Sequence, residues 1–202
     1  LAASGGKVVA VAGDAALGAT ARQVMETAVR ELGGFDILAN IAGAFPTVNV
    51  EDTTDDLYAE TVGANLTSTF VMCREALPCL RARGGGVIVN MSSTAARLPT
   101  PGLAVYGAAK AGIEAFSRAL AVEVAPDIRV NTVSAGPTMT ETVRALLGND
   151  PTEASATVTR ALPLKRLAEP DEIAEAVLFL ASPRASFVTG QVLHANGGGI
   201  MA

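Results

Sequence analysis

The sequence has no tryptophan, one histidine and two cysteines among its 202 residues. One histidine and two cysteines cannot supply the four ligands of a structural zinc site, and two cysteines cannot form the disulfide framework of a small secreted domain. We therefore expect no metal ion in the protein. Cys73 and Cys79 lie six residues apart in a helix-like stretch, which puts them on different faces and predicts two buried thiols.

Charge and long apolar runs are also scarce. Fifteen Lys and Arg against 20 Asp and Glu give a formal net charge of −5, which leaves no basic surface for a nucleic-acid partner. No stretch approaches the roughly 18 uninterrupted apolar residues of a membrane span. Hydrophobic residues still make up 50% of the chain, enough for a core and too many for disorder. The composition predicts a cytoplasmic globular protein with neither membrane nor nucleic acid among its partners.

Short apolar runs alternate with longer helix-like ones. Five runs bounded by Gly, Pro, Asp or Ser predict strands at residues 8–11, 37–41, 87–91, 128–133 and 191–195. Apolar spacings of three and four predict helices at residues 20–32, 54–83, 105–124 and 170–182. Pro78 predicts a kink, or two consecutive helices, inside the second of these. The alternation indicates βαβ units, so we expect an α/β fold with a doubly wound parallel sheet in a single domain over residues 1–202.

Small and polar residues follow the predicted strands. The first four strands end at residues 13–14, 40–43, 92–93 and 135–138. Gly and Ser commonly terminate strands, so each of these ends alone indicates no more than a turn. Open α/β sheets bind ligands beyond the carboxyl ends of their strands. Four such ends in succession therefore predict a crevice that a ligand can enter.

Tyr106 and Lys110 lie four residues apart in a predicted helix, so phenol and ammonium share one face, one turn apart. A cation held there favours the phenolate and lowers the pKa of the tyrosine, which becomes usable as an acid or base near neutral pH. A surface pair at this spacing is the alternative. Tyr106 is one of two tyrosines and follows Ser93 by 13 residues. We expect the three side chains to converge at one catalytic spot.

In this order and context, Ser93, Tyr106 and Lys110 resemble the catalytic set of the short-chain dehydrogenase/reductase family. The resemblance covers essentially the whole chain. Further stretches similar to motifs of that family are residues 40–43, Asn65 with its neighbours, and residues 131–140, 187–191 and 194–198. The chain departs from the family pattern at four positions, with Ile41, Ala135, Thr138 and Asn196 in place of Asn, Pro, Val and Asp.

The resemblance implies a Rossmann-like fold, NAD or NADP as cofactor, and hydride transfer between a secondary alcohol and a ketone. The implied catalytic residues are Tyr106 for the hydroxyl proton, Ser93 for the substrate oxygen, Lys110 for the tyrosine pKa and the nicotinamide ribose, and Asn65 for a proton-relay water. Asn65 as a plain helix-surface amide is the alternative. The implied cofactor-binding residues are Asp14 at the adenine and Asn40, Ala42, Gly43, Tyr106, Lys110, Gly136, Thr138 and Thr140 along the rest of the dinucleotide.

One motif of the family has no counterpart in the sequence. Family members open with a strand and a Gly-rich turn, Thr-Gly-x-x-x-Gly-x-Gly, that cradles the pyrophosphate at a helix N-terminus. The nearest glycine pattern, residues 12–19, reads instead as the turn after a later strand. We therefore expect the chain to lack the first two strands and the phosphate loop, which would occupy about 50 residues before Leu1 in the parent protein.

That expectation has a geometric consequence. In the strand order 3-2-1-4-5-6, strand 8–11 would lie about 14 Å from strand 37–41, at roughly 4.8 Å per spacing. Backbone groups facing such a gap would be unpaired. Either the chain cannot bind a dinucleotide as it stands, which we favour, or its first strand pairs in a new place.

Three further expectations concern the surroundings of the site. Residues 138–165 are predicted to form a substrate lid. The resemblance implies a homo-oligomer, a tetramer or dimer formed through the helices at 54–83 and 105–124. His194, in the closing strand, is predicted to serve packing or an interface. Two alternatives to the short-chain enzyme are an extended nucleotide-sugar epimerase or dehydratase, and a catalytically dead fragment or pseudo-enzyme that acts only through association.

Overall fold

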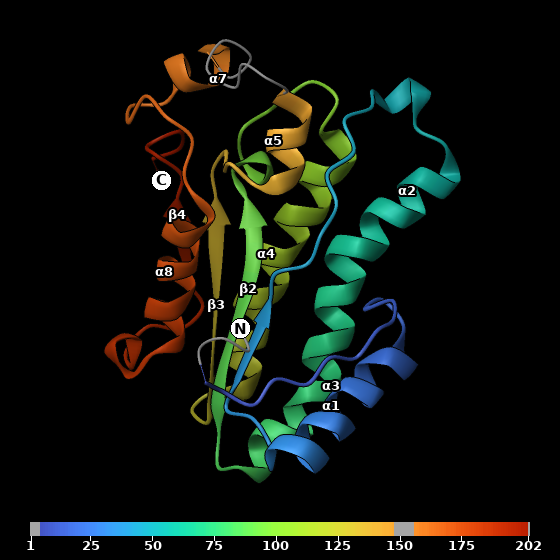
Figure 1. The fold of residues 1–202 in the computed structure, drawn as a ribbon, viewed down its shortest axis with the longest axis vertical. Coiled ribbons are helices and arrows are strands. Elements are labelled where there is room, and N and C mark those ends of the chain that lie inside the picture. Colours follow the sequence, from blue (N-terminus) through green and yellow to red (C-terminus); the bar gives the residue numbers. More distant parts are fainter. Residues whose placement is uncertain (1–4, 148–155, 202) are drawn as a thin grey trace.

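A four-stranded parallel sheet forms the centre of the molecule. The structure, a computed structural model, describes residues 5–147 and 156–201. The strands lie in the order of the sequence: β1 (Ile37–Asn40), β2 (Gly86–Ser93), β3 (Ile128–Ala135) and β4 (Val192–Ala195). Each neighbouring pair is parallel, and the crossovers between strands carry helices (Figure 1). This arrangement confirms the predicted α/β Rossmann-like class.

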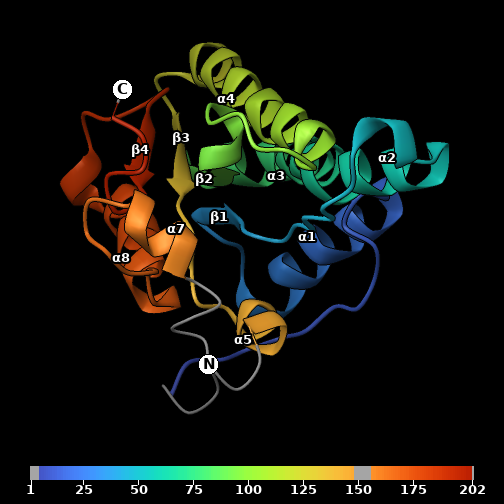
Figure 2. The same ribbon diagram turned by 90° about the horizontal axis from the view of Figure 1, so that it is seen from above.

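Helices cover both faces of the sheet (Figure 2). One face packs against α1 (Gly18–Leu32), α3 (Ser68–Ala82) and α4 (Ala104–Val124), and the other packs against α8 (Pro170–Ala181). Shorter helices lie at the ends of the crossovers: α2 (Asp55–Val62), α5 (Glu141–Leu147) and α7 (Ala156–Ala161). The apolar strand runs are continuous because successive side chains bury on opposite faces, as Ile88 and Val89 do.

Local sequence signals set several helix ends. Helix α1 ends at Gly33, which has a left-handed φ of 79° and donates its N–H to the Val29 carbonyl. Helix α8 begins with Pro170 in its first turn, and Glu169 and Glu172 form a reciprocal capping box around it. Both ends agree with the predicted boundaries of these helices.

The long helix predicted for residues 54–83 is irregular at a different place from the one expected. The chain forms α2, then a π-helical turn (Gly63–Thr67), then α3, which continues through Pro78 to Ala82. The kink assigned to Pro78 is therefore misplaced. Buried Ala76 and Leu80 hold α3 against the sheet on either side of the proline, so the loss of one backbone hydrogen bond does not end the helix.

The strand predicted at residues 8–11 is wrong. These residues form no strand, and the sheet pairings of the part of the chain that the structure describes join β1 to β2 alone. Val8 is 50% exposed and Val9 is 38% exposed. A strand needs a neighbour for its amides and carbonyls, and this segment runs to α1 at the surface, where water can satisfy them (Figure 1). The proposed new pairing of this run with β1 is likewise not observed.

Among residues 5–147 and 156–201, no helix is both long enough and apolar enough to cross a bilayer.

Candidate active site

The carboxyl ends of β1, β2 and β3 meet at one edge of the sheet. Asn40 ends β1, Ser93 ends β2, and Ser93 lies in register with Ala135 of β3. Helix α4 starts above this edge and runs back along β2 and β3 (Figure 1). The sequence-predicted residues Tyr106 and Lys110 lie in its first two turns, so the fold brings them to the end of β2.

Ser93 and Tyr106 lie side by side at this edge, and the Ser93 hydroxyl accepts a hydrogen bond from the Ala95 amide at 3.2 Å. The half-buried Tyr106 ring packs against Phe45, with 6.3 Å between ring centroids. Burial raises the pKa of the Tyr106 phenol above its usual value of 10.0, and the Ser93 side chain acts in the opposite direction. The sequence-based expectation of a lowered tyrosine pKa is therefore wrong for this structure, because burial outweighs the other effects.

Lys110 is buried at the same place, with 3% of its surface exposed. Its Nζ lies 5.7 Å from the centroid of the Tyr106 ring and donates a hydrogen bond to the Met91 carbonyl at 3.0 Å. Burial lowers the pKa of Lys110 to about 8. The ammonium faces the ring and a carbonyl, with no carboxylate among these contacts, so it is available to a polar ligand.

Asn65 lies in the π-helical turn and is fully buried, which excludes the alternative of a helix-surface amide. Its Nδ2 donates to the carbonyls of Ala44 (2.8 Å) and Thr61 (2.9 Å). Its Oδ1 is buried and has no hydrogen-bond partner among the residues that the structure describes. A Cβ built on Gly43 would stand 2.5 Å from this Oδ1 and 3.3 Å from Lys110 Nζ. Gly43 therefore lies against both groups, and only a residue without a side chain fits there.

Asn40 and Ala42 are two further residues that the sequence predicts to bind the cofactor. The Asn40 side chain points into the α3–α4 side of the sheet, where Nδ2 donates to Asn90 Oδ1 at 2.8 Å and to Cys73 Sγ at 3.3 Å. It joins two strands and leaves only its backbone for a ligand. Burial raises the pKa of the Cys73 thiol to about 12, so this thiol is unreactive. Ala42 is exposed in the loop after β1.

The loop after β3 carries Gly136, Thr138 and Thr140. A Cβ on Gly136 would lie 2.6 Å from Asn196 Cα, so glycine lets this loop pass close to the end of β4. Thr138 Oγ1 donates to the Gly136 carbonyl at 2.9 Å. Thr140 Oγ1 accepts from the Val143 amide at 3.3 Å at the start of α5.

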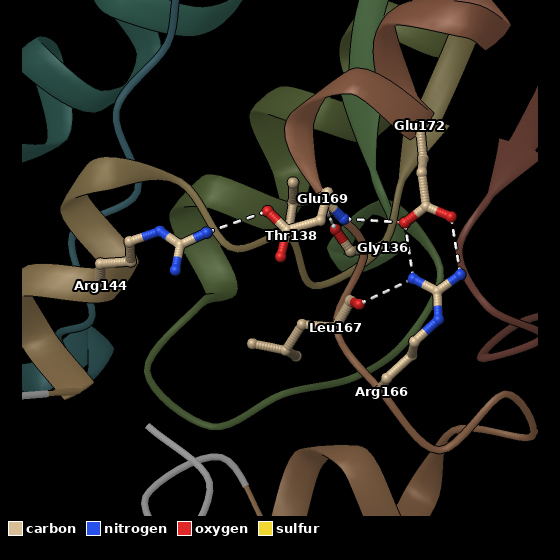
Figure 3. A network of polar contacts seen from close by, with 7 residues as sticks. All are labelled: Gly136, Thr138, Arg144, Arg166, Leu167, Glu169 and Glu172. Atoms are coloured by element: carbon tan, nitrogen blue, oxygen red, sulfur yellow. Dashed lines mark hydrogen bonds and ion pairs between the residues drawn. The ribbon is translucent and has the colours of Figure 1, made fainter. Parts of the chain in front are cut away.

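Residues that sequence reasoning missed hold this loop in place (Figure 3). Thr138 forms a parallel bridge to Ala168, with the Met139 amide donating to the Ala168 carbonyl at 2.8 Å. Beside the bridge, Arg144 pairs with Glu169 at 3.0 Å, and Arg166 pairs in a bidentate manner with Glu172. The spacing Glu169-Pro170-x-Glu172 is a capping-box signal that could have found them. They attach both α5 and the 166–169 segment to the start of α8.

Asp14 lies apart from these residues in its described contacts. It is exposed, its carboxylate accepts from the Ala16 amide at 2.8 Å, and its carbonyl accepts from the Leu17 amide at 3.1 Å. These bonds turn the chain into α1. The structure gives Asp14 a local role and does not bring it against Tyr106 or Lys110 in any hydrogen bond of the described residues.

Two cavities border the site. The smaller, about 380 Å³, lies beside the loop after β1 and is lined by residues 43–46 together with Leu57, Glu60, Thr61 and Thr142. The larger, about 570 Å³, lies near β4 and the start of α8, with Pro137, Ile173 and His194 among its lining residues. The smaller cavity is the one next to the catalytic set, because its wall includes Phe45, which packs on Tyr106.

These groups fit one end of a nicotinamide dinucleotide. Lys110 offers a buried donor, Asn65 Oδ1 a buried unused acceptor, and Gly43 a surface that a side chain would fill. Such convergent polar groups on close-approaching backbone suit a ribose and an amide. The pyrophosphate end is different, because the 202 residues contain no Thr-Gly-x-x-x-Gly-x-Gly turn.

The chain is similar to known proteins over most of its length. A family model described as Enoyl-(Acyl carrier protein) reductase matches residues 1–199. An uncharacterized oxidoreductase of Thermotoga maritima is 36% identical over 197 residues, which cover 96% of this chain and 78% of that protein. The 3-oxoacyl-(acyl-carrier-protein) reductase FabG of Vibrio cholerae is 38% identical over 176 residues, covering 87% of this chain and 70% of that protein.

Two solved structures of dehydrogenases superpose closely on the chain. A short-chain dehydrogenase/reductase of Brucella melitensis, titled glucose/ribitol dehydrogenase, superposes with a TM-score of 0.91 at 36% identity, over 100% of this chain and 81% of that chain. The ligand-free aldohexose dehydrogenase of Thermoplasma acidophilum gives a TM-score of 0.89 at 26% identity, over 94% of this chain and 77% of that one.

Fold, site and relatives define an oxidoreductase of the Rossmann-like α/β class. The chain belongs to the short-chain dehydrogenase/reductase family, whose members use NAD or NADP and act on small molecules.

Proposed function

We propose that the protein is an NAD(P)-dependent oxidoreductase that interconverts a secondary alcohol and a ketone, with Tyr106 as the general acid and base. One observation carries the proposal: Ser93 and Tyr106 meet at the end of β2, where the serine hydroxyl acts on the phenol, and the buried Lys110 Nζ lies 5.7 Å from the ring. A hydroxyl, a phenol and a cation at one spot are what carbonyl reduction needs for binding the oxygen and supplying a proton.

Each side chain has a definite task in this proposal. Ser93 binds the substrate oxygen, and Tyr106 donates its proton to that oxygen during reduction and takes it back during oxidation. Burial keeps the phenol protonated near neutral pH, which favours the reductive direction. Lys110, whose pKa is about 8, holds a proton close to the phenol and binds the nicotinamide ribose. When bound, the cofactor supplies or accepts the hydride.

The proposed cofactor contacts extend from this centre. Asn65 holds a water for proton relay through its unused Oδ1, a task supported by its burial beside Gly43. The remaining cofactor residues are proposed as Asp14 at the adenine, and Asn40, Ala42, Gly43, Gly136, Thr138 and Thr140 along the nicotinamide half. The substrate is a small ketone or secondary alcohol in the 380 Å³ cavity beside Phe45.

The decisive variant is Tyr106→Phe, which removes the exchangeable proton and keeps the ring. Wild type and variant are assayed with NADH and NADPH against carbonyl compounds that include a 3-oxoacyl thioester, which carries a ketone, and an aldohexose lactone, which is an ester. We expect Tyr106→Phe to lose turnover by at least about 10²-fold while binding NAD(P)H as before. Tyr58→Phe, at the exposed second tyrosine, should keep full activity. Full activity in Tyr106→Phe would refute the assignment.

We also propose a homo-oligomer, a tetramer or dimer, formed through α3 and α4 in the cytoplasm. Exposed apolar side chains on these helices support it, among them Phe70 (43%) and Val122 (81%). Sedimentation of wild type and Phe70→Ser tests the assembly. The lid proposed for residues 138–165 includes α5 and α7, while residues 148–155 lie outside the described residues.

A further inference from the structure

A buried carboxylate lies one helical turn beyond Lys110. The Glu114 side chain is 4% exposed and faces the polar end of β2. Its Oε1 is 3.1 Å from Ser92 Oγ, and its Oε2 accepts a hydrogen bond from Arg97 Nε at 3.2 Å. Arg118, one turn further on α4, comes within 3.7 Å of the same Oε2. Neither Ser93 nor Tyr106 is among these partners.

The two close partners of Glu114 flank Ser93 in the sequence. Ser92 precedes it, and Arg97 follows the 3₁₀ turn η4 (Thr94–Ala96). One carboxylate on α4 therefore attaches both ends of the segment that carries Ser93. Ser92 Oγ also lies 3.2 Å from the Lys110 carbonyl, so its single proton is shared between two acceptors on α4.

The segment between these attachments is closely packed on α4. A Cβ built on Gly107, the residue after Tyr106, would stand 2.6 Å from the Ala95 carbonyl oxygen. Beyond Ser93 the chain leaves the sheet ladder. The direction of the Ser93 hydroxyl then depends on what holds the turn against α4, and a buried carboxylate between two donors is a strong attachment.

We propose that Glu114 is a positioning residue that fixes Ser93 beside Tyr106. The proposal rests on the proposed function of these two residues, and Glu114 itself touches neither substrate nor cofactor. It acts by clamping residues 92–97 to the helix that bears the phenol and the ammonium.

The effect of Glu114 on Ser93 can be measured without an activity assay, through the titration of Tyr106. The chain has no tryptophan and two tyrosines, so in a Tyr58→Phe background the ultraviolet absorbance of tyrosinate reports Tyr106 alone. The Ser93 hydroxyl lowers the pKa of Tyr106. Its removal in Ser93→Ala should therefore move the titration midpoint to higher pH.

Glu114→Gln is the test variant. An amide of the same size can still accept from Arg97 through its oxygen and donate to the Ser92 hydroxyl through its nitrogen, but both hydrogen bonds lose their charged partner, so both attachments are weakened. We expect its midpoint to move to higher pH, in the same direction as that of Ser93→Ala. The sign is informative, because removal of a nearby negative charge without any movement of Ser93 would shift the midpoint to lower pH.

The chain supplies matched controls. Ser92 and Ser134 are partners in register on β2 and β3 and both are buried, but the Ser134 hydroxyl has no hydrogen-bond partner in the described residues. Ser92→Ala should shift the midpoint upward and Ser134→Ala should leave it unchanged. Arg118→Gln, which removes only the longer contact, should also leave it unchanged. Ser92→Ala further keeps the test open if Glu114→Gln does not fold.

Turnover gives a second readout. For Glu114→Gln we expect kcat to fall by about 10- to 100-fold, as for other small misplacements of reacting groups, with the affinity for NAD(P)H unchanged. A midpoint that stays or falls in Glu114→Gln, or that stays in Ser93→Ala, overturns the proposal. A wild-type chain that reduces no ketone but shows the upward shifts refutes the proposed function and leaves the clamp established.

Discussion

The two ends of the sheet face beneath α4 are built from opposite chemistry. Near the amino ends of the strands, this face carries Leu38, Ile88 and Val130, all in one apolar core. Two residues further along the same strands it carries Asn40, Asn90 and Thr132, which lie side by side in register. Ser92, Ser134 and His194 form the next row, again in register.

The difference teaches where stability and function are separated in this domain. The apolar end buries carbon against α3 and α4 and needs no partners. The polar end is also buried, and its centre is paired: Asn90 accepts from Asn40 and donates to Ser117, both at 2.8 Å. Among the described residues, Thr132 Oγ1, Ser134 Oγ and His194 Nδ1 beside it have no hydrogen-bond partner. Lys110 and Glu114 join this end, and Tyr106 lies at its edge. The polar end, where burial costs free energy, is therefore the end that carries the proposed catalytic residues.

The largest effect on stability is expected at the apolar end. Ile88 is fully buried between sheet and helices, so Ile88→Ala leaves a cavity and should lower the free energy of unfolding by about 2–5 kcal/mol. Urea unfolding followed by circular dichroism measures it. Val50→Ala, at a 67% exposed position outside the proposed interface helices, serves as the control and should change little. An Ile88→Ala loss below about 1 kcal/mol would contradict the division between the two ends.

A pH effect of nearly the same size is expected from Lys110. Its pKa is about 8 in the folded state and 10.5 in the reference state, so between these values the unfolded chain binds more protons and stability rises with pH. Wild type should gain up to about 3 kcal/mol over Lys110→Met between pH 8 and pH 10.5. Unfolding curves of both proteins across this range test it. Parallel profiles would show that the buried ammonium is not destabilised.

A moderate loss of stability is expected when the hydrogen-bond network at the polar end loses one of its members. Asn90→Ala leaves Asn40 Nδ2 and Ser117 Oγ each without one partner, and should lower the free energy of unfolding by about 1–3 kcal/mol. The exposed Asn49 provides the matched substitution: Asn49→Ala should stay within about 0.5 kcal/mol of wild type. Equal effects of the two substitutions would mean that the network adds nothing.

The smallest effect carries the opposite sign. Thr132 Oγ1 is buried without a partner among the described residues, so the isosteric Thr132→Val should leave stability unchanged or raise it by about 1 kcal/mol. Thr69, equally buried, donates from Oγ1 to the Asn65 carbonyl at 2.8 Å, and Thr69→Val should destabilise. A destabilising Thr132→Val would indicate that its hydroxyl has a partner, such as a bound water.

Much of the fold follows from local patterns. The runs at 37–41, 87–91, 128–133 and 191–195 all contain strands, and α1, α4 and α8 begin and end within two residues of the predicted helices. Gly33 sets the end of α1 and Pro170 sets the start of α8, because the conformational requirement of each acts within a few residues. The run at 8–11 has the same composition but forms no strand, because a strand requires a neighbour that its own sequence cannot provide.

The candidate site divides in the same way. Ser93, Tyr106 and Lys110 could be selected from spacing and from the helix that must follow β2. Glu114 could not, because a glutamate one turn beyond a lysine is typical of a solvated helix face, and only its burial against Ser92 and Arg97 gives it a task. Two roles were open for Asn65 from the sequence, because an asparagine in a helix is also typical of a solvated surface. Its full burial in the structure excludes the surface role.

The sequence by itself determined the α/β class, the places of four strands and the three residues of the proposed catalytic set, because these depend on periodicity and on residues that act over one or two turns. Tertiary structure alone decided the direction of the Tyr106 pKa and the meeting of Gly43, Asn65 and Lys110. Both depend on burial and on contacts between residues far apart in the chain, and burial is a property of the packed fold rather than of any segment.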